Sequence, residues 1–307
     1  MTAHVLDDSI RTLRLIIHPD TMLRRIAPRI APPSNEAVVL GNDFVFDTLI
    51  VNDGRPNRIV FLHGLGGSPE LMMLLLEHLA ITHDATILAP HLPCHGHTSD
   101  VASYPEFIDR IAEWFDRFEL SGVPVIGHSL GALTLVHLAS IRPDLVSGGV
   151  CLALPTKRPA TQIKYQALMA TLAADVSFTT SVALTAAILR RRGRLLSSAL
   201  IKNTLQGCRL QALSKLLQDI ADPEINLCDL AMPMQYLFGG ADIAIRPPSP
   251  ELGIHPVVLA GQPHCFPLLR TAWPAISVAL ERVLYPESSP ELTRLIPKQH
   301  ANNPAMA

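Results

Sequence analysis

Short apolar runs alternate along this chain with segments whose apolar residues recur at helical spacing. Runs of the first kind indicate buried strands, and repeats of the second kind indicate helices. We therefore expect strands at residues 43–51, 58–62, 85–90, 123–126, 146–154, 232–238 and 255–260. Helices are expected at residues 71–81, 105–120, 132–139 and 267–284. This alternation predicts an α/β fold with a mostly parallel sheet and helices on both of its faces.

The alternation is interrupted between residues 156 and 225, where apolar residues keep helical spacing and strand-like runs are missing. We interpret 156–225 as a helical cap inserted into a core formed by residues 41–155 and 226–286. Residues 1–40 are expected to form an N-terminal extension, in which an apolar, basic segment precedes a proline-containing linker. The proline-rich residues 287–307 are expected to form a loose tail.

The composition indicates one large globular domain with an inserted subdomain, because 307 residues with 48% hydrophobic and 17% charged content can bury a full core. The net charge of −2 gives no reason to expect nucleic acid as a partner, and no apolar run has membrane-spanning length. Asp7 and Asp8 precede the first apolar cluster, which is the wrong order for a secretory signal, so a cytoplasmic location is expected.

The five scattered cysteines are expected to be free thiols: Cys94, Cys151, Cys208, Cys228 and Cys265.

The cap differs from the core in charge. Residues 156–218 hold ten basic residues and one acidic residue, whereas the remaining residues carry a net charge of −11. One interpretation is a solvated basic face, or a cap docked on an acidic body. The other is attraction of an anionic substrate or carrier, such as a coenzyme A phosphate, an acidic acyl carrier protein or a carboxylate-bearing ester. Under the second interpretation, turnover should weaken steeply as salt is added.

The sequence Gly127-His-Ser-Leu-Gly131 lies between an expected strand and an expected helix. A G-x-S-x-G sequence in this context is typical of a nucleophile elbow, whose serine hydroxyl stands at the end of a sheet. We expect Ser129 to adopt a strained backbone conformation and to act as a nucleophile. Glycine is needed on both sides because larger side chains would collide across the sharp turn.

A glycine-rich turn at residues 63–68 follows another expected strand. It lacks the G-K-[ST] ending of a phosphate loop and does not match G-x-G-x-x-G, which disfavours nucleotide binding. We expect the backbone N–H groups of Leu65 and Leu130 to form an oxyanion hole instead, each contributing about 3 to 4 kcal/mol of transition-state stabilisation.

Three histidines lie close together in the loop after the strand at 85–90, namely His91, His95 and His97. Imidazoles are common zinc ligands, but no second ligand group accompanies them in the sequence, so we expect no metal site here. His128, inside the elbow, is expected to pack or hydrogen-bond beneath it rather than carry protons.

Asp242 and His264 follow the last two expected strands. Taken singly, each fits a surface turn, and Ser129 also fits a turn serine. Their order of serine, acid and histidine at the ends of successive strands nevertheless predicts a catalytic triad. In such a triad His264 takes the proton of Ser129, and Asp242 orients the imidazole and stabilises its charged form.

Together these motifs resemble the α/β-hydrolase fold family over residues 42–285, and Leu92-Pro-Cys-His-Gly96 is similar to a loop common in that family. The chain departs from the usual glycine at Cys94, and it has Gln262-Pro263 where many members place glycine before the histidine. The resemblance implies an eight-stranded sheet, an inserted cap, and hydrolysis of a carboxylic ester or thioester through an acyl-enzyme without a cofactor.

Several alternatives remain open because one fold hosts many reactions. The same triad would serve an acyltransferase or a C–C bond hydrolase, and a binding protein could keep the fold without turnover. Epoxide and haloalkane hydrolysis are disfavoured, because those reactions need aspartate where Ser129 stands. The expected partner is a small ester or thioester. The basic charge of the cap is compatible with a substrate that is anionic or attached to a carrier.

Overall fold

The computed structural model of this chain describes residues 30–156, 204, 207–209, 212–213, 230–242, 245–248 and 253–286. The apolar, basic segment before residue 30 and most of the predicted cap lie outside the described residues, as do the C-terminal tail and Cys228. No helix in the described part of the chain is long and apolar enough to cross a membrane.

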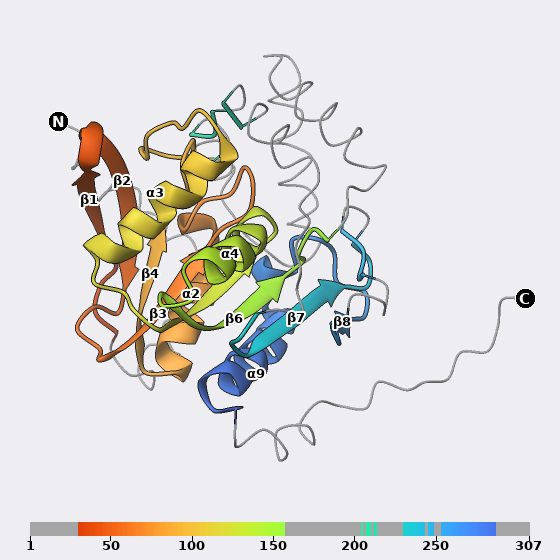
Figure 1. The fold of residues 1–307 in the computed structure, drawn as a ribbon. Helices are drawn as coiled ribbons and strands as arrows, with labels where there is room; N and C mark the ends of the chain where they lie inside the picture. The colour runs from red at the N-terminus through yellow and green to blue at the C-terminus, as the bar shows by residue number, and fades with distance from the viewer. Residues whose placement is uncertain are drawn as a thin grey trace, which may run out of the picture.

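The described residues form an eight-stranded sheet with the order β1-β2-β4-β3-β5-β6-β7-β8 (Figure 1). Pairing is antiparallel between β1 and β2 and between β2 and β4, and it is parallel across the rest of the sheet. The mostly parallel α/β sheet predicted from the sequence is therefore confirmed. The strands are β1 Ser34–Leu40, β2 Phe44–Val51, β3 Asn57–Leu62, β4 Ala85–Pro90, β5 Val123–His128, β6 Val146–Leu152, β7 Met234–Gly239 and β8 Val257–Leu259.

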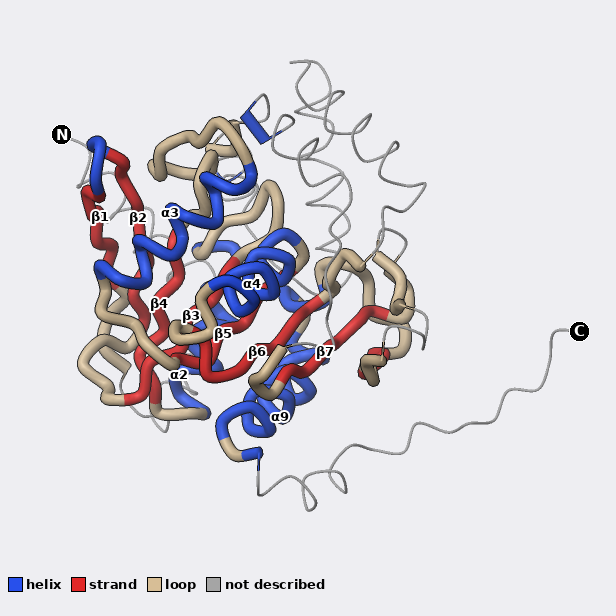
Figure 2. Tube along the Cα trace, in the orientation of Figure 1, coloured by secondary structure: helices blue, strands red, loops and turns tan. Residues whose placement is uncertain are grey.

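Helices cover both faces of the sheet, and α3 and α4 cross in front of it in Figures 1 and 2. Successive residues of β3 point to opposite faces, because side chains alternate along a strand. Val60 and Leu62 pack with α3 and α4, whereas Ile59 and Phe61 pack with α2 and α9. The helices are α2 Met73–Thr82, α3 Tyr104–Arg117, α4 Leu130–Ile141 and α9 Trp273–Leu284.

The aromatic face predicted for the helix after β4 is core. Phe107, Trp114 and Phe115 of α3 are fully buried. The indole Nε1–H of Trp114 donates a hydrogen bond to Thr48 Oγ1 on β2 at 2.9 Å, so the one polar atom of this side chain is satisfied. This packing joins α3 to the antiparallel end of the sheet.

Two elements differ from the prediction. Residues Ser34–Leu40, assigned to the N-terminal extension, form β1 and pair with β2. The strand was missed because it is an edge strand in which only Val38 is buried, so its sequence has little apolar alternation. The last helix is also shorter than expected: two 3-10 turns, Phe266–Leu268 and Arg270–Ala272, precede α9. The extended backbone of Leu269 (φ −102°, ψ 124°) separates these turns.

Candidate active site

Ser129 lies between β5 and α4 in the strand–turn–helix arrangement that the sequence predicted. Its backbone has φ 52° and ψ −111°, a conformation that a non-glycine residue rarely adopts. A Cβ on Gly127 would stand 2.3 Å from Gly131 O, and a Cβ on Gly131 would stand 2.1 Å from Leu62 O. Only glycine fits at both positions, so the turn is as sharp as a nucleophile elbow requires.

The elbow also presents backbone N–H groups. Ser129 N–H donates to Leu152 O on β6 at 2.8 Å, which ties the turn to the neighbouring strand. Leu130 is the first residue of α4, and the first N–H groups of a helix have no partner within the helix. Leu130 N–H is one of these groups and lies at the end of the helix where the dipole favours an anion.

Asp242 and His264, far apart in the sequence, meet where β7 and β8 end. His264 Nδ1–H donates to Asp242 Oδ2 at 2.7 Å, and the Asp242 side chain is fully buried. The other carboxylate oxygen, Oδ1, accepts the N–H of Ile245 at 2.9 Å. With the proton of the neutral imidazole on Nδ1, the second ring nitrogen, Nε2, carries a lone pair that can accept a proton.

Close backbone packing brings the loop that carries Asp242 against the loop that carries His264. Gly240 N–H donates to Leu259 O at 2.8 Å, and Ala241 N–H donates to Gln262 O at 2.9 Å. A Cβ on Gly239 would stand 2.3 Å from Gln262 O, so any other residue there would push the two loops apart. Gly239 is therefore needed for the contact between Asp242 and the imidazole.

His128 links the elbow to the same loop. Its Nε2–H donates to the backbone carbonyl of His264 at 3.1 Å, and the two ring centroids are 5.0 Å apart. Burial and the nearby His264 lower the pKa of His128 to about 3, so this imidazole is neutral near pH 7. The expectation that His128 hydrogen-bonds beneath the elbow is confirmed.

The glycine-rich turn at residues 63–68, hereafter the oxyanion loop after the role predicted for Leu65, packs directly on the elbow. Gly67 N–H donates to Gly64 O at 2.9 Å, which closes a β-turn with Leu65 and Gly66 at its centre. Gly66 has φ +66°, which glycine adopts without strain. A Cβ on Gly64 would stand 2.8 Å from His128 Nδ1. The turn's own hydrogen bond uses neither of its two central N–H groups, those of Leu65 and Gly66.

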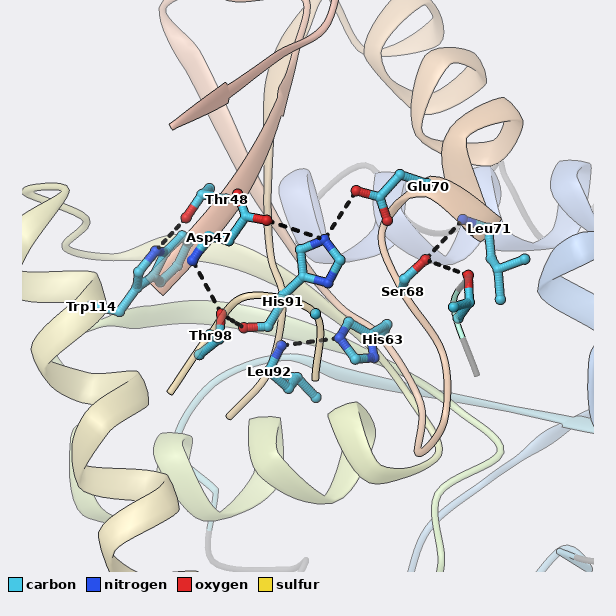
Figure 3. Close-up of polar contacts among 12 residues, drawn as sticks. Asp47, Thr48, His63, Ser68, Glu70, Leu71, His91, Leu92, Thr98 and Trp114 are labelled. Carbon is cyan, nitrogen blue, oxygen red and sulfur yellow. Dashed lines mark hydrogen bonds and ion pairs between the residues drawn. The ribbon is translucent and has the colours of Figure 1, made fainter. Parts of the chain in front are cut away.

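The loop after β4, residues 91–99, hereafter the histidine loop, has carboxylates beside it that the sequence analysis missed. His91 Nε2 lies 3.0 Å from Glu70 Oε1 and 3.7 Å from Asp47 Oδ2 (Figure 3). Burial opposes its charge, but Glu70 and then Asp47 raise the pKa of His91. Burial also opposes ionisation of Glu70, yet His91 lowers the pKa of that carboxyl to about 2. His91 and Glu70 thus form an ion pair that is largely buried.

Two of the three histidines of this loop, His91 and His95, bind protein groups through their rings. His95 Nδ1–H donates to Pro93 O at 3.0 Å, and its Nε2 accepts the N–H of Gly66 at 3.0 Å. Among the described residues, no group of three or more His, Cys, Asp or Glu side chains has the arrangement of a metal site.

Two described residues of the predicted cap contact the loops around the candidate site. Thr204 Oγ1 lies 3.2 Å from Ser68 Oγ on the oxyanion loop. Arg209 forms an ion pair with Asp100 and donates to the carbonyl of Gly96 at 2.8 Å. For Arg209, this geometry agrees with a cap docked on an acidic body. The other basic cap residues lie outside the described residues.

The described cysteines are free thiols, as expected, and three of them are buried. Burial raises the pKa of Cys94 to about 11 and that of Cys208 to about 12. These thiols are therefore poor nucleophiles. Cys94 has φ 67°, which explains why glycine suits this position of the loop.

The chain belongs to the alpha/beta hydrolase fold family, whose pattern matches residues 57–226, more than half of its length. The fold agrees with that of a solved hydrolase from Pseudomonas aeruginosa (TM-score 0.67, 15% sequence identity), over 82% of this chain and 98% of that one. At this identity the likeness establishes the fold alone.

Curated relatives match shorter stretches. The lipase LipV of Mycobacterium tuberculosis is 31% identical over 99 residues, which is 32% of this chain and 37% of that protein. A protein named probable alcohol acetyltransferase, from Cyberlindnera jadinii, is 26% identical over 147 residues, 45% of this chain and 41% of that protein. The matched stretches thus span less than half the length of these relatives, which include a hydrolase and an acyltransferase.

Proposed function

We propose that this protein is a serine hydrolase that cleaves a carboxylic ester or thioester through an acyl-enzyme. Ser129 is the nucleophile, His264 the general base and Asp242 the group that orients His264. The observation that carries the proposal is the 2.7 Å contact between His264 Nδ1 and a fully buried Asp242 carboxylate, in a loop bonded to the elbow of Ser129. No cofactor is required for this chemistry.

In the proposed reaction, Nε2 of His264 removes the hydroxyl proton of Ser129 as the oxygen attacks the carbonyl carbon. The N–H groups of Leu65 and Leu130 bind the resulting oxyanion. The imidazolium then gives its proton to the leaving alcohol or thiol, and an acyl-serine remains. Water, activated by the same imidazole, releases the acid and restores the free hydroxyl.

Acyl transfer to an alcohol is a second candidate, favoured by the matched stretch in the acetyltransferase relative. It would use the same acyl-serine, with an alcohol in place of water in the second half-reaction. The two activities differ in their products: hydrolysis yields a free acid, whereas transfer yields a new ester when an alcohol such as ethanol or isoamyl alcohol is added.

The deciding experiment compares p-nitrophenyl esters and acyl-CoA thioesters of matched chain length for the wild type and Ser129→Ala. A hydrolase should release acid, and the variant should lose turnover while keeping its far-ultraviolet circular dichroism and melting temperature. Turnover by Ser129→Ala would overturn the triad. Correctly folded wild-type protein without turnover on either substrate would overturn the esterase and thioesterase assignment in favour of a binding role.

The same assay in low and high salt tests whether the basic cap receives an anionic carrier. If it does, kcat/KM for the acyl-CoA should fall about tenfold or more between about 20 and 300 mM salt, because screening weakens attraction between exposed charges. The p-nitrophenyl ester, which lacks phosphates, is the matched control. If salt changes kcat/KM equally for both substrates, the basic residues of the cap form a solvated face or a face docked on the core, and they do not attract a carrier.

A further inference from the structure

The oxyanion loop is held against the histidine loop at both ends. At its start, His63 Nε2 accepts the N–H of Leu92 at 3.0 Å (Figure 3). Just beyond its other end, Glu70 forms the buried ion pair with His91. These contacts fix where the loop begins and ends. Its central turn is closed by the hydrogen bond from Gly67 N–H to Gly64 O, and a further contact holds that turn from outside.

His95 supplies that central contact. Its Nε2 accepts the N–H of Gly66 at 3.0 Å, and this N–H belongs to the planar peptide unit that joins Leu65 to Gly66. Fixing this unit limits rotation about the backbone of Leu65. The direction of the Leu65 N–H, one residue earlier, is therefore limited as well.

The hydrogen bonds of His95 define its tautomer. Because Nδ1–H donates to Pro93 O at 3.0 Å, Nε2 of the neutral ring carries the lone pair that Gly66 N–H needs. The side chain is almost fully buried, and burial lowers the pKa of His95 to about 4. The ring of His63 packs edge-on against it, with centroids 4.8 Å apart, and holds its plane. His95 is thus a rigid neutral acceptor near pH 7.

We propose that His95 is a positioning residue for the oxyanion hole: it fixes the Leu65–Gly66 peptide so that Leu65 N–H points at the oxyanion formed on Ser129. This inference rests on the proposed function, because it needs an acyl-transfer step at Ser129. His95 acts only through the loop backbone, and its loss should lower kcat more than it raises KM.

Two substitutions separate the hydrogen bonds of His95. The side-chain oxygen of glutamine in His95→Gln reaches as far as Nε2 and keeps an acceptor for Gly66. The shorter side chain of asparagine in His95→Asn reaches only as far as Nδ1, so it keeps a donor for Pro93 and loses the acceptor. We expect kcat to fall about 10- to 100-fold in His95→Asn, somewhat less than the loss of an oxyanion donor costs, and less than about threefold in His95→Gln.

Rates should be expressed per active site, counted by labelling Ser129 with a fluorophosphonate. Phenylboronic acid, which forms a tetrahedral adduct on an active serine, is the second probe. Its inhibition constant should rise in His95→Asn by the same factor by which kcat/KM falls, with KM unchanged. If both variants lose only melting temperature or labelled fraction, at unchanged kcat per labelled site, His95 is structural and the proposal fails. Equal losses of kcat in both variants also overturn it.

Failure of the proposed function has a different signature, because wild-type turnover would then be absent or would persist in Ser129→Ala. If the His95 variants do not fold, the wild type still allows a test. Nuclear magnetic resonance should detect a scalar coupling across the hydrogen bond between the Gly66 nitrogen and His95 Nε2, both free and in the boronate adduct. Absence of that coupling from the adduct overturns the proposal.

Discussion

The Nε2–H of His128 donates to the backbone carbonyl of His264 at 3.1 Å, so the residue before the candidate nucleophile holds the loop that carries the candidate base. The elbow and this loop are separate in the chain, and a direct hydrogen bond sets their spacing. Ser129 and His264 are thereby linked by a contact that uses neither of their own side chains.

Burial of His128, with the nearby His264, makes stability sensitive to acid. The pKa of His128 is about 3 in the folded protein, against an ordinary value of 6.5. On acidification the unfolded chain binds this proton first, so the contribution of His128 to stability is full above about pH 6.5 and falls by about 1.4 kcal/mol per pH unit below it. Urea unfolding at about pH 5, 6 and 7 measures this slope. His128→Gln should reduce it by about one proton, and an unchanged slope would contradict the assignment.

Asp242→Asn should leave the fold intact and remove most of the turnover. The amide can hold the imidazole in the wrong tautomer and cannot stabilise its charged form, so kcat should fall about 10³- to 10⁴-fold. Ester hydrolysis and thermal unfolding check the two halves of this prediction. Asp144→Asn, which alters an exposed carboxylate paired with Arg142, is the matched control and should keep kcat. A small effect of Asp242→Asn would show that the acid lies elsewhere.

Gly131→Ala should destabilise the protein because its Cβ would stand 2.1 Å from Leu62 O, a backbone atom of β3 that cannot move freely. We expect a loss of about 2 kcal/mol or more in the free energy of unfolding, measured by urea denaturation, with loss of Ser129 labelling. Gly41→Ala is the control: nothing lies within 4 Å of its Cβ, and it should change stability by less than about 0.5 kcal/mol. Equal effects would refute a steric requirement at the elbow.

Glu70→Gln should destabilise the protein by about 3 kcal/mol, because it leaves the His91 imidazole without its nearest ionised partner inside the protein. The contribution of Glu70 is present above its ordinary pKa of 4.5 and is lost as the pH falls toward about 2. The pKa of His91 is raised, so its contribution is full below about 6.5 and is lost as the pH rises through the raised value.

The pair should therefore stabilise the fold most between about pH 4.5 and 6.5. Chemical unfolding across this range, together with titration of the His91 resonances, is the measurement. In Glu70→Gln the pKa of His91 should fall, although Asp47 still faces the ring at 3.7 Å. An unchanged His91 pKa would show that another group supports the charge.

The elements that form the candidate site were predictable because their signals are local. The C-terminal ends of parallel strands share one edge of the sheet, so the residues after β5, β7 and β8 had to gather there. The contact between His264 and Asp242 follows from that rule once the strands are recognised. The requirement for glycine at positions 127 and 131 was equally predictable, because it arises from steric crowding within a single turn.

The buried ion pair could not be predicted in the same way. Glu70 follows Ser68 and Pro69 at a helix start, where an acidic residue has an ordinary local role. Its partner His91 lies beyond α2 and β4, and nothing in either segment specifies the pairing. The edge strand β1 was missed for a related reason, since it is defined by hydrogen bonds to β2 and buries few side chains.

The parallel pairing of β6 with β7 has a consequence for biosynthesis. β6 ends at Leu152, whereas β7 begins only at Met234, and both Asp242 and His264 follow it in the chain. A nascent chain can complete β5, the elbow and β6 long before the acid and the base have been translated. The complete candidate triad should thus form last, after β7 has paired with β6 across the longest sequence separation between neighbouring strands of the described sheet. A prematurely terminated chain would carry Ser129 without the acid and the base that activate it.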